Sequence, residues 1–155
     1  MFSEIREIVD DIILKYESEA AKKIKFSSEI LNLISDLSKR YKLGIFTLQL
    51  SEIVEEILEK YGIDKLFQTI VGRNDVACIK PAPEHLLKVL SEMNIKNSEV
   101  MVVGDHPDDL RCADSISAGY IAILKPNFFN INEIIDLKID FYLHSLADLK
   151  KILKI

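Results

Sequence analysis

Residues 100–109 constrain this chain more than any other stretch of its sequence. The apolar run Val100-Met101-Val102-Val103 is typical of a strand buried on both faces, and it ends at Gly104. Asp105 follows directly, and Asp109 comes in the first turn of an expected helix. In an open parallel sheet, ligands bind at the carboxyl ends of the strands. Two carboxylates that meet there suit a hard divalent cation such as Mg²⁺, which prefers oxygen ligands and keeps several waters.

The remainder of the chain alternates strands with helices. Short apolar runs predict strands at 43–47, 67–71, 100–104, 119–124 and 141–143. Helical periodicity and capping residues predict helices at 3–24, 27–41, 51–61, 84–93, 107–117, 131–137 and 146–153. This alternation predicts an α/β fold of three layers, doubly wound and Rossmann-like, with a mainly parallel sheet. The chain is purely helical before residue 26, so we expect a helical segment, 1–25, followed by an α/β core, 26–155.

Composition narrows the classes of protein to consider. With 155 residues, of which 48% are hydrophobic and 29% charged, the chain fits one globular domain. A net charge of −5 argues against nucleic-acid binding. No apolar run reaches the roughly 18–20 residues that span a bilayer, and the N-terminus does not resemble a signal peptide. We therefore expect a cytoplasmic protein that does not associate with a membrane. Frequent Ile, Lys and Glu with only two Gln are typical of thermophilic proteins and equally of AT-rich genomes.

The cysteines and two of the histidines suggest no chemistry of their own. Cys78 and Cys112 lie far apart in the sequence and form no metal-binding pattern, which fits a reducing compartment. His85 and His144 are expected at the surface.

Three chemical groups follow predicted strands or precede a predicted helix. They are the Thr47 hydroxyl, the Lys80 ammonium and the carboxylates of Asp105 and Asp109. A hydroxyl can donate a hydrogen bond to a phosphoryl oxygen, and an ammonium can neutralise the charge that develops in the transition state. A metal held by the carboxylates can bridge the phosphate to the protein. Together, these groups predict a site for a phosphoryl group.

In their order along the chain, these residues resemble the motifs of the haloacid dehalogenase superfamily of phosphohydrolases. The family's second motif, an apolar strand ending in Thr or Ser, is similar to Leu43-Gly-Ile-Phe-Thr47. The third, Lys-Pro-x-Pro-Glu, is similar to Lys80-Pro-Ala-Pro-Glu84, and the fourth, Gly-Asp-x-x-x-Asp, to Gly104 through Asp109. The resemblance covers roughly residues 26–153. It implies a Mg²⁺-dependent phosphomonoesterase domain that acts on a small phosphorylated metabolite.

The resemblance also implies a role for each matching residue. Asp105 and Asp109 would hold the Mg²⁺, while Thr47 and Lys80 would bind the phosphoryl group. Two neighbouring residues are candidates for contacts with the substrate: Gln49 and His106.

The family's first motif, Asp-x-Asp-Gly-Thr, has no counterpart before Thr47. In the family, its first Asp attacks phosphorus and its second acts as general acid and base. The nearest acidic pair, Asp10-Asp11, is adjacent rather than spaced and lies in a helix-periodic segment. We therefore expect residues 1–155 on their own to be inactive, residues 3–24 to be a remnant of a helical cap, and the chain to begin just after the missing strand. The alternative is a non-catalytic relative that binds a phosphorylated ligand or a protein partner.

The strand of that first motif is central in the family, between the strands of the second and fourth motifs. Without it, strands 43–47 and 100–104 can pair directly, another segment or a partner chain can fill the gap, or the fold can be marginal. Direct pairing is the arrangement we favour, because both strands run in the same direction. An exposed strand edge would also predict a homodimer.

Overall fold

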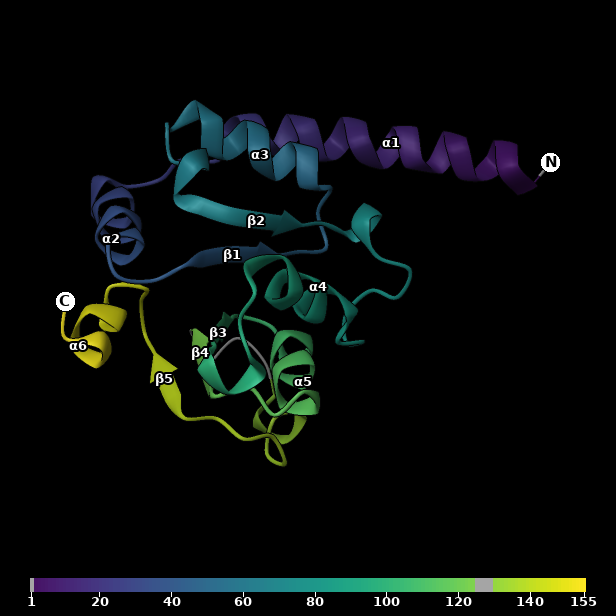
Figure 1. Cartoon of the computed structure of the whole chain (residues 1–155). Coiled ribbons are helices and arrows are strands. Elements are labelled where there is room, and N and C mark those ends of the chain that lie inside the picture. Colours follow the sequence, from purple (N-terminus) through teal and green to yellow (C-terminus); the bar gives the residue numbers. More distant parts are fainter. Residues whose placement is uncertain (1, 125–129) are drawn as a thin grey trace.

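A computed structural model describes residues 2–124 and 130–155, in which helices alternate with parallel strands (Figure 1). The helices are α1 (Phe2–Lys23), α2 (Ser28–Ser38), α3 (Ser51–Lys60), α4 (Glu84–Met93), α5 (Pro107–Ser115) and α6 (Asp148–Leu153). The strands are β1 (Leu43–Phe46), β2 (Phe67–Val71), β3 (Met101–Gly104), β4 (Tyr120–Leu124) and β5 (Phe141–Leu143). Each of these elements overlaps a predicted one.

Local sequence signals explain where several of the elements begin and end. The Ser27 hydroxyl accepts a hydrogen bond from the Ile30 N–H at 3.3 Å and so caps α2. Gly62 follows α3 with a φ of 66°, a left-handed conformation that glycine adopts without steric cost. The predicted helix at 131–137 is wrong, because only Ile131–Glu133 form a short 3₁₀ helix. A short helix forms few hydrogen bonds relative to the number of residues whose backbone it orders, so it gains little stability.

The strands form two separate parallel sheets. One sheet pairs β1 with β2, and the other has the order β3-β4-β5. In the second sheet Val102 lies opposite Ile121. Among the residues that the structure describes, β1 and β3 form no ladder and no strand lies between them. The expected direct pairing of these two strands is therefore wrong.

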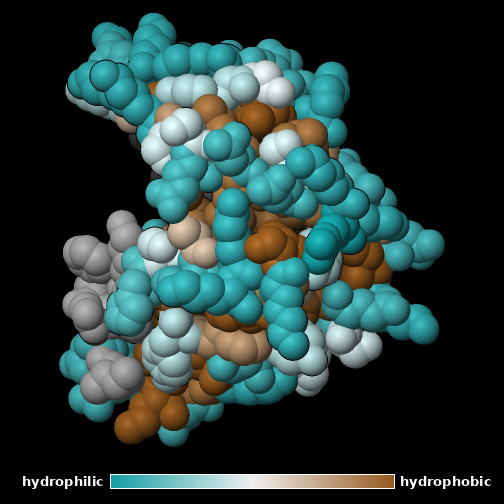
Figure 2. Space-filling view, turned by 90° about the vertical axis from the view of Figure 1, so that its left-hand side faces the viewer, coloured by the Kyte–Doolittle hydropathy of each residue, from teal (hydrophilic) through white to brown (hydrophobic). Residues whose placement is uncertain are grey.

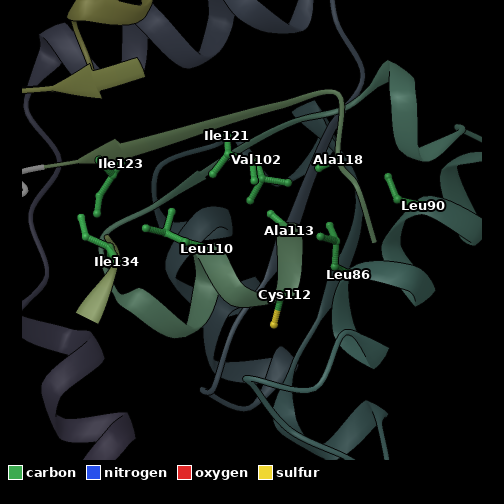
Figure 3. Packing of buried hydrophobic residues seen from close by; sticks show 10 residues of the cluster. All are labelled: Leu86, Leu90, Val102, Leu110, Cys112, Ala113, Ala118, Ile121, Ile123 and Ile134. Atoms are coloured by element: carbon green, nitrogen blue, oxygen red, sulfur yellow. The ribbon is translucent and has the colours of Figure 1, made fainter. Parts of the chain in front are cut away.

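Helix α4 packs on both sheets on one face. Its Leu86 and Leu90 pack into the cluster around β3 and α5 (Figure 3). The adjacent row of Val89 and Met93 packs against Val71 of β2. A Cβ added at Gly44 of β1 would lie 2.6 Å from the Met93 sulfur, so α4 also lies directly on β1. A single helix thus packs on both sheets.

The opposite face is covered by α2, α3 and α6. Leu37 of α2 packs with Leu143 and Leu149 of the β3-β4-β5 half. An ion pair at 3.4 Å joins Lys150 of α6 to Asp36 of α2. With α4 and α5 on the other face, the molecule has three layers, which confirms the predicted α/β doubly wound class.

Helix α1 lies along α3 and extends beyond it (Figure 1). Ala21, near its carboxyl end, is buried with Ile53 and Ile57 of α3. Towards the other end, Ile8 and Ile12 are exposed. No helix within 2–124 and 130–155 is both long enough and apolar enough to cross a membrane. The division at residue 25 stays a prediction.

Candidate functional site

Four of the predicted site residues line a single pocket at the carboxyl ends of β1 and β3. They are Thr47, Lys80, Asp105 and Asp109, and the pocket has a volume of about 270 Å³. Apart from Gly104, the other lining residues are apolar: Ile45, Phe46, Val103, Leu124 and Leu146. The structure therefore brings a hydroxyl, an ammonium and two carboxylates together from segments far apart in the sequence.

Lys80 is held in place by three contacts. Its Nζ donates to Asp109 Oδ1 at 2.6 Å and to the Phe46 carbonyl oxygen at 3.1 Å. The ammonium also lies 4.3 Å from the centre of the Phe46 ring. The Lys80 and Asp109 side chains are only 9% and 10% exposed, so this charge-assisted hydrogen bond is largely shielded from water. The cation is thus pre-positioned beside the pocket.

Asp109 is pressed against the end of β3. Its Oδ2 accepts hydrogen bonds from the N–H groups of Asp105 and His106, at 3.3 and 3.2 Å. Gly104 permits this approach, because a Cβ there would lie 2.4 Å from the Asp109 Cβ and 2.8 Å from Oδ2. A residue with a side chain at position 104 would therefore displace the carboxylate. Close packing thus explains why this position is a glycine.

The donor set of the pocket fits a hard cation. Asp105 is exposed and lines the same pocket as Asp109, so two carboxylates are present. Mg²⁺ typically binds through one or two carboxylates and completes its octahedron with waters and substrate oxygens. Within residues 2–124 and 130–155, no three His, Cys, Asp or Glu side chains are close enough to hold a metal together. The two carboxylates at the pocket match this mode of Mg²⁺ binding.

Thr47 follows the last residue of β1 and lines the pocket. Its N–H donates to the Val71 carbonyl at 2.9 Å, as if the strand ran one residue further. Its Oγ1 accepts a hydrogen bond from the Gln49 N–H at 3.1 Å. The hydroxyl oxygen is therefore fixed by the turn, while its hydrogen can be donated to a ligand.

Gln49 and His106 lie near the pocket but do not line it. The Gln49 carbonyl accepts from the Arg73 N–H at 3.0 Å, in the loop after β1. His106 caps α5: its Nδ1 accepts from the Asp108 N–H at 3.2 Å, and its side chain is 67% exposed. Their proposed contacts with substrate stay predictions.

His85, which is influenced by the charge of Lys80, was expected at the surface, and this expectation is wrong. It is fully buried in the first turn of α4, and neither ring nitrogen has a hydrogen-bond partner among the described residues. Burial lowers the pKa of His85, and the charge of Lys80 lowers it further. The signal was present, since His85 shares a helical row with Val89 and Met93, both buried. His144 is exposed, as expected.

Comparison with known sequences identifies a protein family that this chain matches over most of its length. Residues 2–123 match the haloacid dehalogenase-like hydrolase family. Pyrophosphatase PpaX of Listeria welshimeri is 28% identical over 148 residues, which cover 94% of this chain and 62% of that protein. Pyrophosphatase PpaX of Bacillus mycoides is 30% identical over 102 residues, which cover 65% of this chain and 42% of that protein. The chain thus spans less than two thirds of the length of these relatives.

Solved structures show the same fold. A haloacid dehalogenase-like family hydrolase, SP0104, from Streptococcus pneumoniae superposes with a TM-score of 0.77 and 16% identity, over 99% of this chain and 71% of that chain. A HAD phosphatase from Thermococcus onnurineus superposes with a TM-score of 0.74 and 24% identity, over 89% of this chain and 64% of that chain.

Proposed function

The chain belongs to the haloacid dehalogenase-like hydrolase family, and on that basis we propose that it forms the phosphate-binding part of a Mg²⁺-dependent phosphohydrolase for small phosphorylated metabolites. The observation that carries this proposal is the convergence of Thr47, Lys80, Asp105 and Asp109 on one pocket. A pocket of about 270 Å³ is small, which favours a phosphoryl group over a large ligand as the part that enters it.

Thr47 and Lys80 would bind the phosphoryl oxygens. Lys80 is fixed by Asp109 and by the Phe46 carbonyl, so its charge needs little reorganisation when negative charge develops on the phosphoryl group. The hydroxyl of Thr47 would donate to a second oxygen from the end of β1. Apolar side chains line part of the pocket and would strengthen both interactions.

Asp105 and Asp109 are the residues that would hold Mg²⁺. The ion would neutralise phosphate charge and polarise a phosphoryl oxygen. Asp109 is fixed by backbone N–H groups and Lys80, whereas Asp105 is exposed at the pocket and can adjust its position.

Turnover would require a group that accepts the phosphoryl group. In the family this is the first Asp of Asp-x-Asp-Gly-Thr, and residues 1–46 contain no such motif. We therefore propose that residues 1–155 bind phosphate without hydrolysing phosphomonoesters. Because the Listeria and Bacillus relatives are named pyrophosphatases, inorganic pyrophosphate is the first substrate to test beside p-nitrophenyl phosphate.

Calorimetric titration with inorganic phosphate in the presence of Mg²⁺ tests the binding claim. We expect Lys80→Met to weaken binding at least tenfold, about 1.4 kcal/mol, because the fixed cation is lost. Thr47→Val removes only the hydroxyl and should weaken binding by about 0.5–1.5 kcal/mol. The matched control is Lys65→Met, whose side chain is 93% exposed and should not alter binding.

Circular dichroism of each variant separates a loss of binding from a loss of folding. Unchanged phosphate affinity in folded Lys80→Met and Thr47→Val would contradict the proposed site. Hydrolysis of p-nitrophenyl phosphate or pyrophosphate that disappears in Asp105→Ala would contradict the proposed inactivity of residues 1–155.

A further inference from the structure

The turn that follows β2 lies against the segment that carries Thr47. This turn is a short 3₁₀ helix, Arg73–Asp75, and Gly72 precedes it. A Cβ added at Gly72 would lie 2.3 Å from the Ser51 nitrogen and 2.7 Å from the Gln49 carbonyl oxygen. Both of these atoms belong to the backbone and cannot rotate away. The turn after β2 and the segment after β1 are therefore in close contact.

Arg73 binds both of the residues that follow Thr47. Its backbone N–H donates to the Gln49 carbonyl at 3.0 Å, and its Nη1 donates to the Leu48 carbonyl at 3.0 Å. The Gln49 N–H in turn donates to Thr47 Oγ1 at 3.1 Å. A single arginine thus holds two consecutive carbonyl groups of the turn that fixes the Thr47 hydroxyl oxygen.

Glu17 of α1 restrains the Arg73 guanidinium. The two side chains form an ion pair through Glu17 Oε1 and Arg73 Nη1, and they are only 20% and 24% exposed. Charge-assisted hydrogen bonds of this kind are stronger than neutral ones. The other carboxylate oxygen of Glu17 is buried and has no hydrogen-bond partner among the described residues. Within that part of the chain, Arg73 is therefore the group that compensates the carboxylate.

Asn74 holds the next part of the same segment, where α3 begins. Its Oδ1 accepts from the Ser51 N–H at 3.2 Å, and its Nδ2 donates to both carboxylate oxygens of Glu52, at 3.0 and 3.1 Å. These contacts do not involve the guanidinium of Arg73. Loss of that guanidinium should therefore loosen residues 48–49 while the start of α3 stays anchored.

We propose that Arg73 is a positioning residue for the candidate site: held by Glu17, it fixes the turn after β1 and so orients the Thr47 hydroxyl towards a bound phosphoryl group. The inference rests on the proposed function, because that function assigns a phosphoryl oxygen to Thr47. Arg73 itself does not line the pocket, so its effect passes through the turn. A donor that is already fixed needs little reorganisation when charge approaches it.

A pair of substitutions that preserves the net charge tests this proposal. Glu17→Gln combined with Arg73→Met removes the ion pair and the hydrogen bond to the Leu48 carbonyl, and it keeps the backbone N–H of residue 73. Because the net charge is unchanged, the long-range attraction of phosphate to the protein is preserved. In calorimetric titration with Mg²⁺ present, we expect the double variant to bind inorganic phosphate about three- to tenfold more weakly, because the contribution of roughly one hydrogen bond is reduced.

The loss should depend on the Thr47 hydroxyl. When Thr47→Val is already present, the same pair of substitutions should change the phosphate affinity by less than about twofold, because the group that Arg73 positions is missing. A general structural effect of Arg73 would instead weaken phosphate binding equally with and without the hydroxyl. The double-mutant cycle therefore separates positioning from a change in folding.

Amide hydrogen exchange provides a readout that does not require phosphate. In the double variant, the Gln49 amide, which donates to Thr47 Oγ1, should exchange faster than in the wild type. The Thr47 amide, which donates to the Val71 carbonyl at 2.9 Å, should keep its protection. The Ser51 amide, held by Asn74, should keep it as well.

Arg40→Met is the matched control for loss of an arginine. Arg40 also donates from Nη1 to a backbone carbonyl, that of Lys154 at 3.3 Å, but it precedes β1 and so lies at the end of the strand opposite the pocket. This variant should change phosphate affinity by less than about twofold. Circular dichroism checks the folding of each variant. Should the double variant not fold, Glu17→Gln alone keeps the shape of the side chain and should shift phosphate affinity and Gln49 exchange in the same direction by a smaller amount.

Two results would overturn the proposal. One is a weakening of phosphate binding that is equal with and without the Thr47 hydroxyl. The other is a folded double variant in which phosphate affinity or the exchange of the Gln49 amide matches the wild type. Failure of the proposed function is distinguishable, because Thr47→Val would then leave phosphate binding unchanged and both proposals would fall. A normal effect of Thr47→Val beside an inert double variant contradicts the role of Arg73 alone.

Discussion

His85 occupies an unusual position for a titratable side chain. It is fully buried at the start of α4, and its ring nitrogens have no partners among the described residues. Removal from water lowers its pKa most and Lys80 lowers it further, whereas Glu84, the Gly72 backbone and Asp75 act less strongly in the opposite direction. The imidazole is therefore neutral in the folded protein over a wider pH range than in the unfolded chain, and folding becomes linked to pH.

This linkage predicts a loss of stability on acidification. As the pH falls below about 6.5, the unfolded chain takes up a proton at His85 before the folded protein does. The contribution of neutral His85 is thus complete above that pH and is lost as the pH falls towards the lowered pKa of the folded state. We expect the free energy of unfolding in urea to fall more steeply between about pH 7 and pH 5.5 for the wild type than for His85→Leu.

His144→Leu is the matched control, because His144 is exposed and should leave the pH dependence unchanged. Parallel pH profiles for the wild type and His85→Leu would show that His85 is not the group responsible.

Lys80, Gly104 and Asp109 illustrate how single residues build the pocket. The absent side chain of Gly104 lets Asp109 approach the strand end, and Asp109 then holds the Lys80 ammonium. An ion pair this far from water depends on both partners, since removing one leaves an uncompensated charge at a cost of about 3–5 kcal/mol. For this reason the folding of Lys80→Met must be checked before its phosphate binding is interpreted.

Among the elements, α4 packs on both sheets on one face of the molecule. It contacts β1 and β2 through one row of side chains and the β3–α5 cluster through the next. On the opposite face, α2 and α6 join the two halves through Leu37 and the Asp36–Lys150 pair. Both halves should therefore unfold together, although no strand within 2–124 and 130–155 connects them.

Substituting a buried side chain by alanine in either row of α4 tests this cooperativity. Leu90→Ala affects the β3 side and Met93→Ala the β2 side, and each should destabilise the protein by about 2–5 kcal/mol. In urea titrations followed by NMR, signals from β2 and β4 should lose intensity at the same midpoint in both variants. Leu87→Ala, at a position 43% exposed on the same helix, should change stability by less than about 0.5 kcal/mol. Separate midpoints for the two sheets would show that α4 does not couple them.

The molecule as a whole consists of two half-sheets (Figure 1), with a cleft of about 860 Å³ between them and the candidate pocket at one end. Figure 2 shows hydrophobic residues at the surface between the upper and lower halves of the molecule. Large apolar surfaces of this kind mark binding sites or association surfaces. An occupant that contacts both half-sheets would bind the folded chain alone, and it should therefore raise the stability of the whole protein rather than of one sheet.

Local sequence was sufficient to identify most of the secondary structure and the residues of the candidate pocket. Helical periodicity, the Ser27 cap and the Gly62 stop are short-range signals, and they place helices within a few residues of their observed ends. Thr47, Asp105 and Asp109 could be grouped because parallel strands end at a common edge. Lys80 was identified through its Pro-x-Pro context, and the structure places it in the same pocket.

The relation between β1 and β3 could not be predicted, whereas the burial of His85 could have been, because His85 shares a helical row with Val89 and Met93. Whether two distant strands pair depends on what packs across both of them. Here Leu86 and Leu90 of α4 pack on the β3 side and Met93 on the β2 side, and no pattern within either strand encodes these contacts. Periodicity is a local property of the chain, whereas the width of a gap results from long-range side-chain packing.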